Sequence, residues 1–324
     1  MSEPLSWDQL RDAAKKITAQ GQGQYYGVVI EGKQTPRFAA FINGLARMAG
    51  AAAGASFGFT EIDWRTGQHV YASDEFLAAV DLLLALKADG SIFPGSTSLN
   101  APQARAQLPQ GTAGMILQGP WNIPEWQRDN PDFKFGVASQ PIPNTGAPTP
   151  LTYEETGANV SWVYAQSPYK AIAGDMFSYM SSVEGQVAMM AATGGNLGSI
   201  IPEAVQIAQD TLDLDPLASK ALALFEEQLR VGPLVAIRNP EAAQVAFERK
   251  PLTPDFGEIV QGIFTGQLSD PGSAMQDLQD RADAELDRAI KAAQDKGAQV
   301  SRDDFVFPNW DPTRDYTEED YAAL

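Results

Sequence analysis

The clearest structural signal in the chain is the stretch Gly111-Thr112-Ala113-Gly114-Met115-Ile116-Leu117-Gln118-Gly119-Pro120-Trp121. Ala113, Met115 and Leu117 alternate with the residues between them, and a glycine stands at each end of the run. This pattern is typical of a short buried strand in an α/β sheet. Because ligands of open α/β sheets bind at the carboxyl ends of the strands, Trp121 either caps the core or offers a stacking face to a flat ligand such as a sugar ring.

Length and charge exclude several classes of protein. The chain has 324 residues, of which 44% are hydrophobic, so it can bury a sizeable core in two domains or lobes. Its formal net charge is −18. Nucleic acids and anionic membrane surfaces attract basic surfaces, so neither is an expected partner. The acidic surface is explained by solubility.

The residue types that most often carry metal sites and catalysis are scarce. The chain has no cysteine, which excludes disulfides and thiolate metal sites. It has one histidine. His69 follows a turn, and we expect it to be an ordinary surface histidine. No P-loop, dinucleotide fingerprint or zinc-ligand spacing occurs. We therefore expect no cofactor, no metal site and no catalytic residue.

Apolar spacing predicts an alternation of helices and short strands. The expected helices cover residues 7–19, 37–49, 74–88, 100–108, 169–182, 184–192, two segments within 203–230, 256–264 and 273–295. The expected strands cover residues 25–30, 113–118, 133–138, 160–164 and 234–237. Aromatic residues near the end of the chain, Phe305, Phe307 and Trp310, are expected to pack back onto the body.

Several phrases in the middle of the chain occur in a characteristic order. They are the glycine-led strand ending in Gly119-Pro120-Trp121, the run Phe133–Ala138 leading to Pro141, the glycine-containing run Thr156–Val163, the phrase Ser181–Gln186, and the turn from Gly194 to Pro202. In this order they resemble the maltose-binding-protein-like solute-binding proteins (family 1) of bacterial ABC importers, which take up sugars and oligosaccharides. The opening Pro4–Leu10 resembles a phrase that lies inside the sequences of that family rather than at their start.

This resemblance implies an α/β, two-lobed fold of the periplasmic-binding-protein type II, with the first lobe incomplete. It places residues 1–152 and 235–324 in the carboxyl-terminal lobe and residues 153–234 in the returning part of the other lobe. The expected location is extracytoplasmic, although no signal peptide or lipid-anchor cysteine is visible. We expect the N-terminal part to be missing through truncation or a misplaced start.

Sugar hydroxyls need hydrogen-bond donors and acceptors, while sugar C–H faces stack on aromatic rings. Candidate ligand-binding residues of these types follow predicted strands or begin predicted helices: Arg37, Trp121, Asn122, Tyr153, Glu155, Asn159, Asn196, Asp255 and Phe256. The resemblance matches Trp121 to the family's stacking tryptophan.

The predicted function is therefore capture of a sugar or oligosaccharide and its delivery to the membrane subunits of an ABC importer. The protein is expected to act as a monomer and not as an enzyme. One alternative is a carbohydrate-active hydrolase that uses acidic residues such as Glu154 or Glu155. The other is a truncated remnant that binds nothing.

Overall fold

The computed structural model describes residues 4–53, 61–145, 150–154 and 161–324, with the backbone alone described for 151–154. The chain forms two compact units. The larger unit comprises Met1–Leu117, Ser139–Thr156 and Gln228–Leu324. The smaller unit comprises Gln118–Ala138 and Gly157–Glu227. Among the described helices, none is long and apolar enough to cross a membrane.

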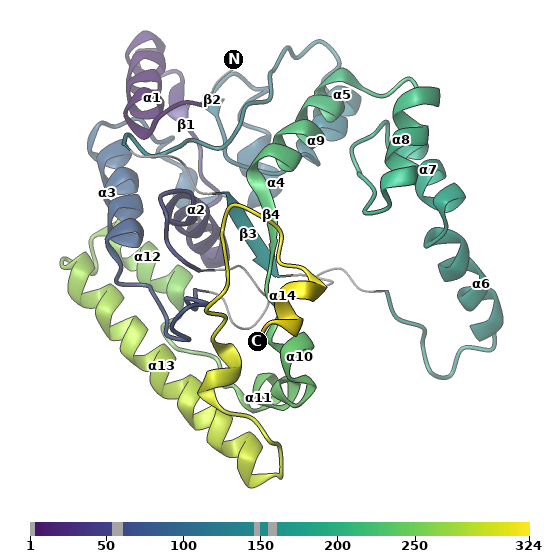
Figure 1. Ribbon diagram of the computed structural model, residues 1–324. Helices are drawn as coiled ribbons and strands as arrows, with labels where there is room; N and C mark the ends of the chain where they lie inside the picture. The colour runs from purple at the N-terminus through teal and green to yellow at the C-terminus, as the bar shows by residue number, and fades with distance from the viewer. Residues whose placement is uncertain (1–3, 54–60, 146–149, 155–160) are drawn as a thin grey trace. The chain divides into compact units, whose positions relative to one another are not determined.

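Two pairs of short parallel strands lie in the larger unit (Figure 1). Strand β1 (Tyr26–Val28) pairs with β2 (Ala113–Met115), so that Tyr26 faces Ala113 and Val28 faces Met115. Strand β3 (Leu151–Glu154) pairs with β4 (Leu229–Gly232). The predicted strands at 25–30 and 113–118 are confirmed, although each regular strand is shorter than its apolar run.

Helices surround these strands in the larger unit. Six of them agree with the helices predicted from periodicity, whereas those at residues 235–238, 243–248 and 318–322 were not predicted as helices. The helices of this unit are α1 (Trp7–Gly21), α2 (Thr35–Met48), α3 (Asp74–Ala88), α4 (Ala101–Arg105), α10 (Val235–Arg238), α11 (Ala243–Glu248), α12 (Phe256–Thr265), α13 (Pro271–Asp295) and α14 (Glu318–Ala322). Short 3-10 turns cover Ser96–Ser98, Pro240–Ala242 and Arg302–Phe305. The Ser6 hydroxyl accepts a hydrogen bond from the Gln9 backbone N–H, which starts α1 at the residue predicted.

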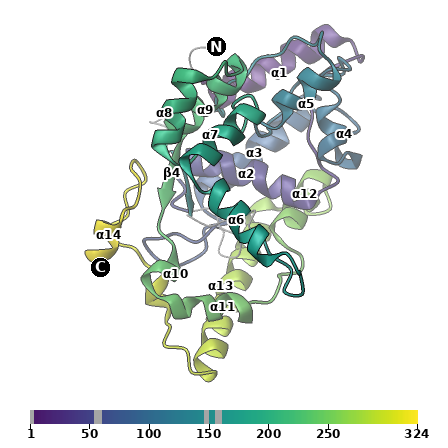
Figure 2. The same cartoon turned by 90° about the vertical axis from the view of Figure 1, so that its right-hand side faces the viewer.

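The main core lies where α2 packs against α3 and α12 (Figure 2). Phe38, Leu45, Phe76 and Leu83 are fully buried there. These residues recur at helical spacing, so each helix turns one apolar stripe inward. Burial of this apolar surface is the main term that stabilises the larger unit.

The end of the chain packs onto the same unit, as predicted from its aromatic residues. Phe305 and Phe307 are fully buried, and Trp310 is 6% exposed. The rings of Trp64 and Trp310 meet edge to face, with their centroids 4.8 Å apart. The final residues therefore belong to a second core cluster with α13 and are not a free tail.

The prediction that His69 is a surface residue is wrong. Its side chain is fully buried, and its Nδ1 lies 2.8 Å from the Asp283 carboxylate on α13. The imidazole stacks on the Tyr71 ring at 5.7 Å between centroids. Burial lowers the pKa of His69, and the hydrogen bond to Asp283 opposes this effect. The predicted turn before His69 is present, but packing against α13, which is distant in the sequence, buries the His69 side chain.

The smaller unit is built from helices in the part of it that the structure describes. They are α5 (Asn122–Asp129), α6 (Lys170–Met180), α7 (Val183–Ala192), α8 (Pro202–Thr211) and α9 (Pro216–Gln228). The side chains that this unit buries are mostly small. Among the described residues, the buried apolar ones are Ile123, Trp126, Met190, Ala204, Ala208, Ala218 and Ala221. Four of these five helices were predicted; α5 lies in a segment for which no helix was predicted.

Three predicted strands are corrected. Residues 133–138 alternate between partly buried and exposed, as a strand would, but no ladder partner lies among the described residues. Residues 161–164 are exposed and outside any strand, and Val160 lies outside the described residues. Residues 235–238 form the helical turn α10, because a short apolar run is compatible with either state and Val235 packs into the second core cluster.

Candidate functional site

Trp121 stands immediately before helix α5 and presents its indole to solvent. Its side chain is 46% exposed, which is unusual for the largest apolar side chain. The backbone at Trp121 is already helical, at φ −57° and ψ −18°, so the residue continues directly into α5. A rigid, exposed aromatic face at a helix start can stack on an apolar ligand surface while its N–H donates a hydrogen bond.

The indole lies directly against the backbone of Gly119. A Cβ atom built on Gly119 would lie 2.1 Å from Cζ3 of the Trp121 ring, far inside van der Waals contact. Only glycine therefore permits this ring position. The sequence phrase Gly-Pro-Trp has a direct steric explanation, which the strand pattern alone did not provide.

The side of α5 away from Trp121 is held by aromatic packing. Trp126 is buried and contacts Phe133 and Phe135 edge to face, at 5.5 Å and 5.0 Å between centroids. Gln127 donates a hydrogen bond to the Asp215 carboxylate at 2.7 Å, and Asp215 also caps the start of α9. These contacts fix the helix that carries Trp121 within the smaller unit.

Two of the predicted polar ligand residues lie in the same unit. Asn122 is 5% exposed at the first turn of α5, and Asn196 is partly buried in the loop after α7. The Asn196 side-chain amide donates to the Thr193 carbonyl at 2.9 Å. Among the described residues, the buried Oδ1 atoms of both asparagines have no hydrogen-bond partner. Each is an acceptor that a hydroxyl donor could satisfy.

The predicted residue Arg37 lies in the first turn of α2, in the larger unit. Its guanidinium is 3.2 Å from the carboxylate of Glu31, whose side chain is 8% exposed. Burial raises the pKa of Glu31, and the nearby Arg37 and Arg105 oppose the increase. Sequence reasoning overlooked Glu31. Its position just after β1, at the carboxyl end of a predicted strand, was the signal that could have identified it.

Asp255 and Phe256 have structural roles in the larger unit. The Asp255 carboxylate accepts the backbone N–H of Glu258 at 2.8 Å, and the Glu258 side chain accepts the backbone N–H of Asp255, which completes a capping box for α12. Phe256 is 7% exposed and packs against Tyr71 and Phe76. The helix start was predicted correctly, but both side chains are engaged in capping and core packing. Their ligand role stays a prediction.

The remaining predicted residues fall where side chains are not described. Tyr153 and Glu154 belong to strand β3, whose backbone alone is described, while Glu155 and Asn159 lie outside the described residues. Within the described ranges, no group of three or more histidine and acidic residues is arranged to hold a metal ion. In the smaller unit, the predicted ligand residues whose side chains are described are Trp121, Asn122 and Asn196.

Comparison with known proteins identifies the family. The profile of the bacterial extracellular solute-binding proteins matches residues 1–187, more than half of the 324 residues. The chain belongs to this family. A binding protein of Brucella abortus is 30% identical to this solute-binding protein over 144 residues, which is 44% of this chain and 32% of the relative.

Solved structures of similar fold are sugar-binding proteins of ABC transporters. The solute-binding protein of Thermotoga lettingae bound to α-D-tagatose has a TM-score of 0.59 at 20% identity, covering 87% of this chain and 65% of its own. The maltose/maltodextrin-binding domain of Bdellovibrio bacteriovorus bound to maltotriose also has a TM-score of 0.59, at 19% identity, covering 88% and 67%. These similarities confirm the predicted α/β, two-lobed fold class of the solute-binding protein.

The matches cover a larger share of this chain than of each relative. This solute-binding protein spans about a third of the length of the curated relatives it matches and about two thirds of the solved chains. The assignment of residues 1–152, 153–234 and 235–324 to the lobes of the complete family fold stays a prediction. The units described above divide the chain by compactness alone.

Proposed function

We propose that this chain captures a sugar or oligosaccharide for an ABC importer and that the ligand stacks on Trp121. The observation that carries the proposal is the indole itself: it is 46% exposed, seated against Gly119 and fixed at the start of α5. An indole exposed at a helix start offers a flat apolar face and an N–H donor to a ligand. Sugar rings have apolar C–H faces that suit it.

The ligands of the structural relatives support this class of substrate. The Thermotoga lettingae relative is bound to a monosaccharide, α-D-tagatose, and the Bdellovibrio bacteriovorus relative to maltotriose. A third relative, from Bacillus licheniformis, is in complex with stachyose, with a TM-score of 0.55 and 15% identity over 88% of this chain and 67% of its own. These ligands differ in size and share the alternation of hydroxyl groups and C–H faces.

Polar recognition in the proposed site comes from the buried asparagine acceptors of the smaller unit. Asn122 adjoins Trp121 in sequence, and its Oδ1 has no partner among the described residues. A sugar hydroxyl that donates to this oxygen would remove the cost of a buried, unsatisfied acceptor. Asn196 offers a second acceptor of the same kind. The predicted roles of Arg37, Tyr153, Glu155, Asn159, Asp255 and Phe256 remain open to the same binding test.

The proposed partners and location follow from the family. A solute-binding protein of this class works outside the cytoplasm and delivers its ligand to membrane permease subunits. Ligand contacts that favour a closed arrangement of the two lobes would drive capture. We infer a monomer as the functional form. Because the family consists of binding proteins, we expect no turnover of glycosides by Glu154 or Glu155.

The test is titration of the chain with α-D-tagatose, maltotriose and stachyose, followed by intrinsic tryptophan fluorescence and isothermal calorimetry. We expect a saturable response to at least one saccharide and a loss of about 1–3 kcal/mol of binding free energy, comparable to one stacked ring in other systems, in Trp121→Ala. Trp121→Phe should retain part of the affinity because it keeps an aromatic face.

The matched control is Trp162→Ala, which removes another exposed indole of the same unit. This variant should bind the saccharide as the parent chain does. Equal losses in the two variants would assign the effect to a general change in the smaller unit. Silence towards all three saccharides, by a chain with an intact thermal transition, would refute the proposal.

A further inference from the structure

Strand β4 lies where the chain passes from the smaller unit into the larger one. A segment of the smaller unit ends at Glu227, and β4 begins at Leu229. Its partner β3 ends at Glu154, close to Thr156, where the chain leaves the larger unit. Both strands of this pair therefore lie next to a connection between the units, and contacts that fix β4 also fix that connection.

Strand β4 has a second neighbour besides β3, namely residues 309–322. We call this segment the strap; in Figure 2 it is the yellow segment that carries α14 and lies beside β4. The Asp315 carboxylate accepts the backbone N–H of Val231 at 2.8 Å, and the Tyr316 N–H donates to the Val231 carbonyl at 2.9 Å. The strap thus satisfies both backbone groups of Val231, as a neighbouring strand would.

Two more hydrogen bonds join the strap to this part of the chain. The Arg230 guanidinium donates to the Thr313 carbonyl at 3.1 Å. The Tyr321 hydroxyl accepts the backbone N–H of Leu234 at 2.7 Å. The contacts of the strap therefore extend over residues 230–234, which include most of β4 and the residues that follow it.

The strap is held in shape by contacts of its own. The Arg314 guanidinium binds both carboxylate oxygens of Asp320, at 2.7 and 2.6 Å. The Asn309 amide donates to the Asp320 carbonyl at 2.8 Å and accepts the Tyr316 hydroxyl at 2.7 Å. The buried Tyr316 ring meets the Phe307 ring edge to face in the second core cluster. A segment fixed in this way binds β4 at a lower cost in conformational entropy than a flexible loop would.

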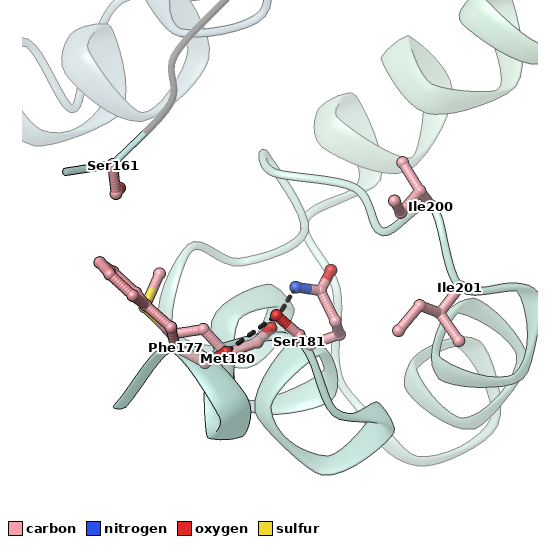
Figure 3. A pocket seen from close by; sticks show the side chains of 7 residues that line it. Ser161, Phe177, Met180, Ser181, Ile200 and Ile201 are labelled. Atoms are coloured by element: carbon pink, nitrogen blue, oxygen red, sulfur yellow. Dashed lines mark hydrogen bonds between the residues drawn. The ribbon is translucent and has the colours of Figure 1, made fainter. Parts of the chain in front are cut away.

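The smaller unit is packed more openly around α6, of which no residue is buried. Figure 3 shows Phe177 and Met180 on one side of a hollow of about 460 Å³, with Ile200 and Ile201 on the other. Side chains separated by a hollow of this size form few dispersion contacts across it. The strap therefore supplies rigidity that this part of the smaller unit does not.

We propose that the strap is a conformational brace, which binds β4 and so limits the movement of the smaller unit relative to the larger one. Because β4 is bound both by β3 and by the strap, it resists bending at the connection between the units. The inference depends on these contacts and not on sugar binding.

Distances between spin labels on the full chain test the proposal. The chain has no cysteine, so Lys16→Cys on α1 and Gln209→Cys on α8 give one exposed label in each unit. In this labelled protein, the double variant Asp315→Ala/Tyr321→Phe removes two acceptors that bind β4 and the residues after it. It should broaden the distribution of distances between the labels.

Hydrogen–deuterium exchange at single amides gives a second measurement on the same variant. The amides of Val231 and Leu234 should exchange about tenfold faster, as expected for the loss of one hydrogen bond each, while amides of α2 and α12 should be unchanged. Tyr321→Phe alone keeps the aromatic ring, so it should show the effect at Leu234 even if the double variant does not fold.

Two further variants separate the brace from a general effect of charge. Glu318→Ala removes the same charge from the strap at an exposed side chain, and it should leave distances and exchange unchanged. Asp315→Asn should also behave as the parent, because its amide oxygen can still accept the Val231 N–H. Unchanged label distances in the double variant would overturn the proposal, as would equal broadening in Glu318→Ala.

Discussion

At the scale of single residues, the exposed indole of Trp121 depends on the glycine two positions before it. The ring contacts the Gly119 backbone so closely that any Cβ there would overlap Cζ3 of the ring. Gly119→Ala should therefore displace the indole and weaken saccharide binding about as much as Trp121→Ala, with little change in thermal stability. Fluorescence emission and calorimetric titration measure both effects.

The control for Gly119 is Gly136→Ala, at a glycine of the same unit whose added Cβ would meet open space. This change should leave binding unaltered. A Gly119→Ala variant that binds like the parent chain would show that the ring position is not needed for recognition.

The single histidine provides a second prediction at this scale. Burial holds the pKa of His69 below the value of about 6.5 expected in the unfolded chain. As the pH falls below 6.5 the unfolded chain binds the proton first, so the free energy of unfolding should decrease, by up to about 1.4 kcal/mol per pH unit, until the folded pKa is reached. Urea unfolding between pH 7.5 and pH 5 measures this slope.

His69→Asn isolates the contribution, because an asparagine amide can still donate to Asp283 but does not titrate. The charged groups that act on this site are Asp283, Arg249 and Arg302, and they stay in place. Glu31 has a raised pKa, so its contribution to the free energy of unfolding increases as the pH falls. This contribution is the same in both proteins and cancels from the difference between their curves. Parallel curves for the two proteins would contradict the assignment.

At the scale of elements, substitutions of Asp255 distinguish a role in capping helix α12 from a role in ligand binding. Its carboxylate accepts the Glu258 backbone N–H at 2.8 Å and so satisfies one of the free donors at the start of α12. Asp255→Ala should lower the free energy of unfolding by about 1 kcal/mol, and Asp255→Asn should largely preserve it. Saccharide affinity should be equal in both variants, whereas a large loss in either would assign Asp255 to the ligand site.

At the scale of the whole molecule, the two units differ in what they bury. The larger unit holds large, fully buried side chains such as Phe38, Phe76 and Leu83, while the helices α8 and α9 bury mainly alanines. We expect backbone amides of α2, α3 and α12 to exchange with solvent at least tenfold more slowly than those of α6–α9 in the chain alone. Equal protection of the two sets would show that the smaller unit has a core of its own.

The sequence by itself determined most of the helices, the strands β1 and β2, and the family, but not the helices α5, α10, α11 and α14. These features depend on local periodicity, capping and turn chemistry, which residues close together in the sequence determine. The sequence placed Trp121 after an apolar strand and left open whether the ring caps the core or faces a ligand; the structure leaves this residue 46% exposed. Tertiary structure decided the rest. His69 is buried because α13, more than two hundred residues later, covers it. Residues 133–138 keep a strand-like alternation without a ladder partner among the described residues, because a strand exists only where another segment supplies its hydrogen bonds.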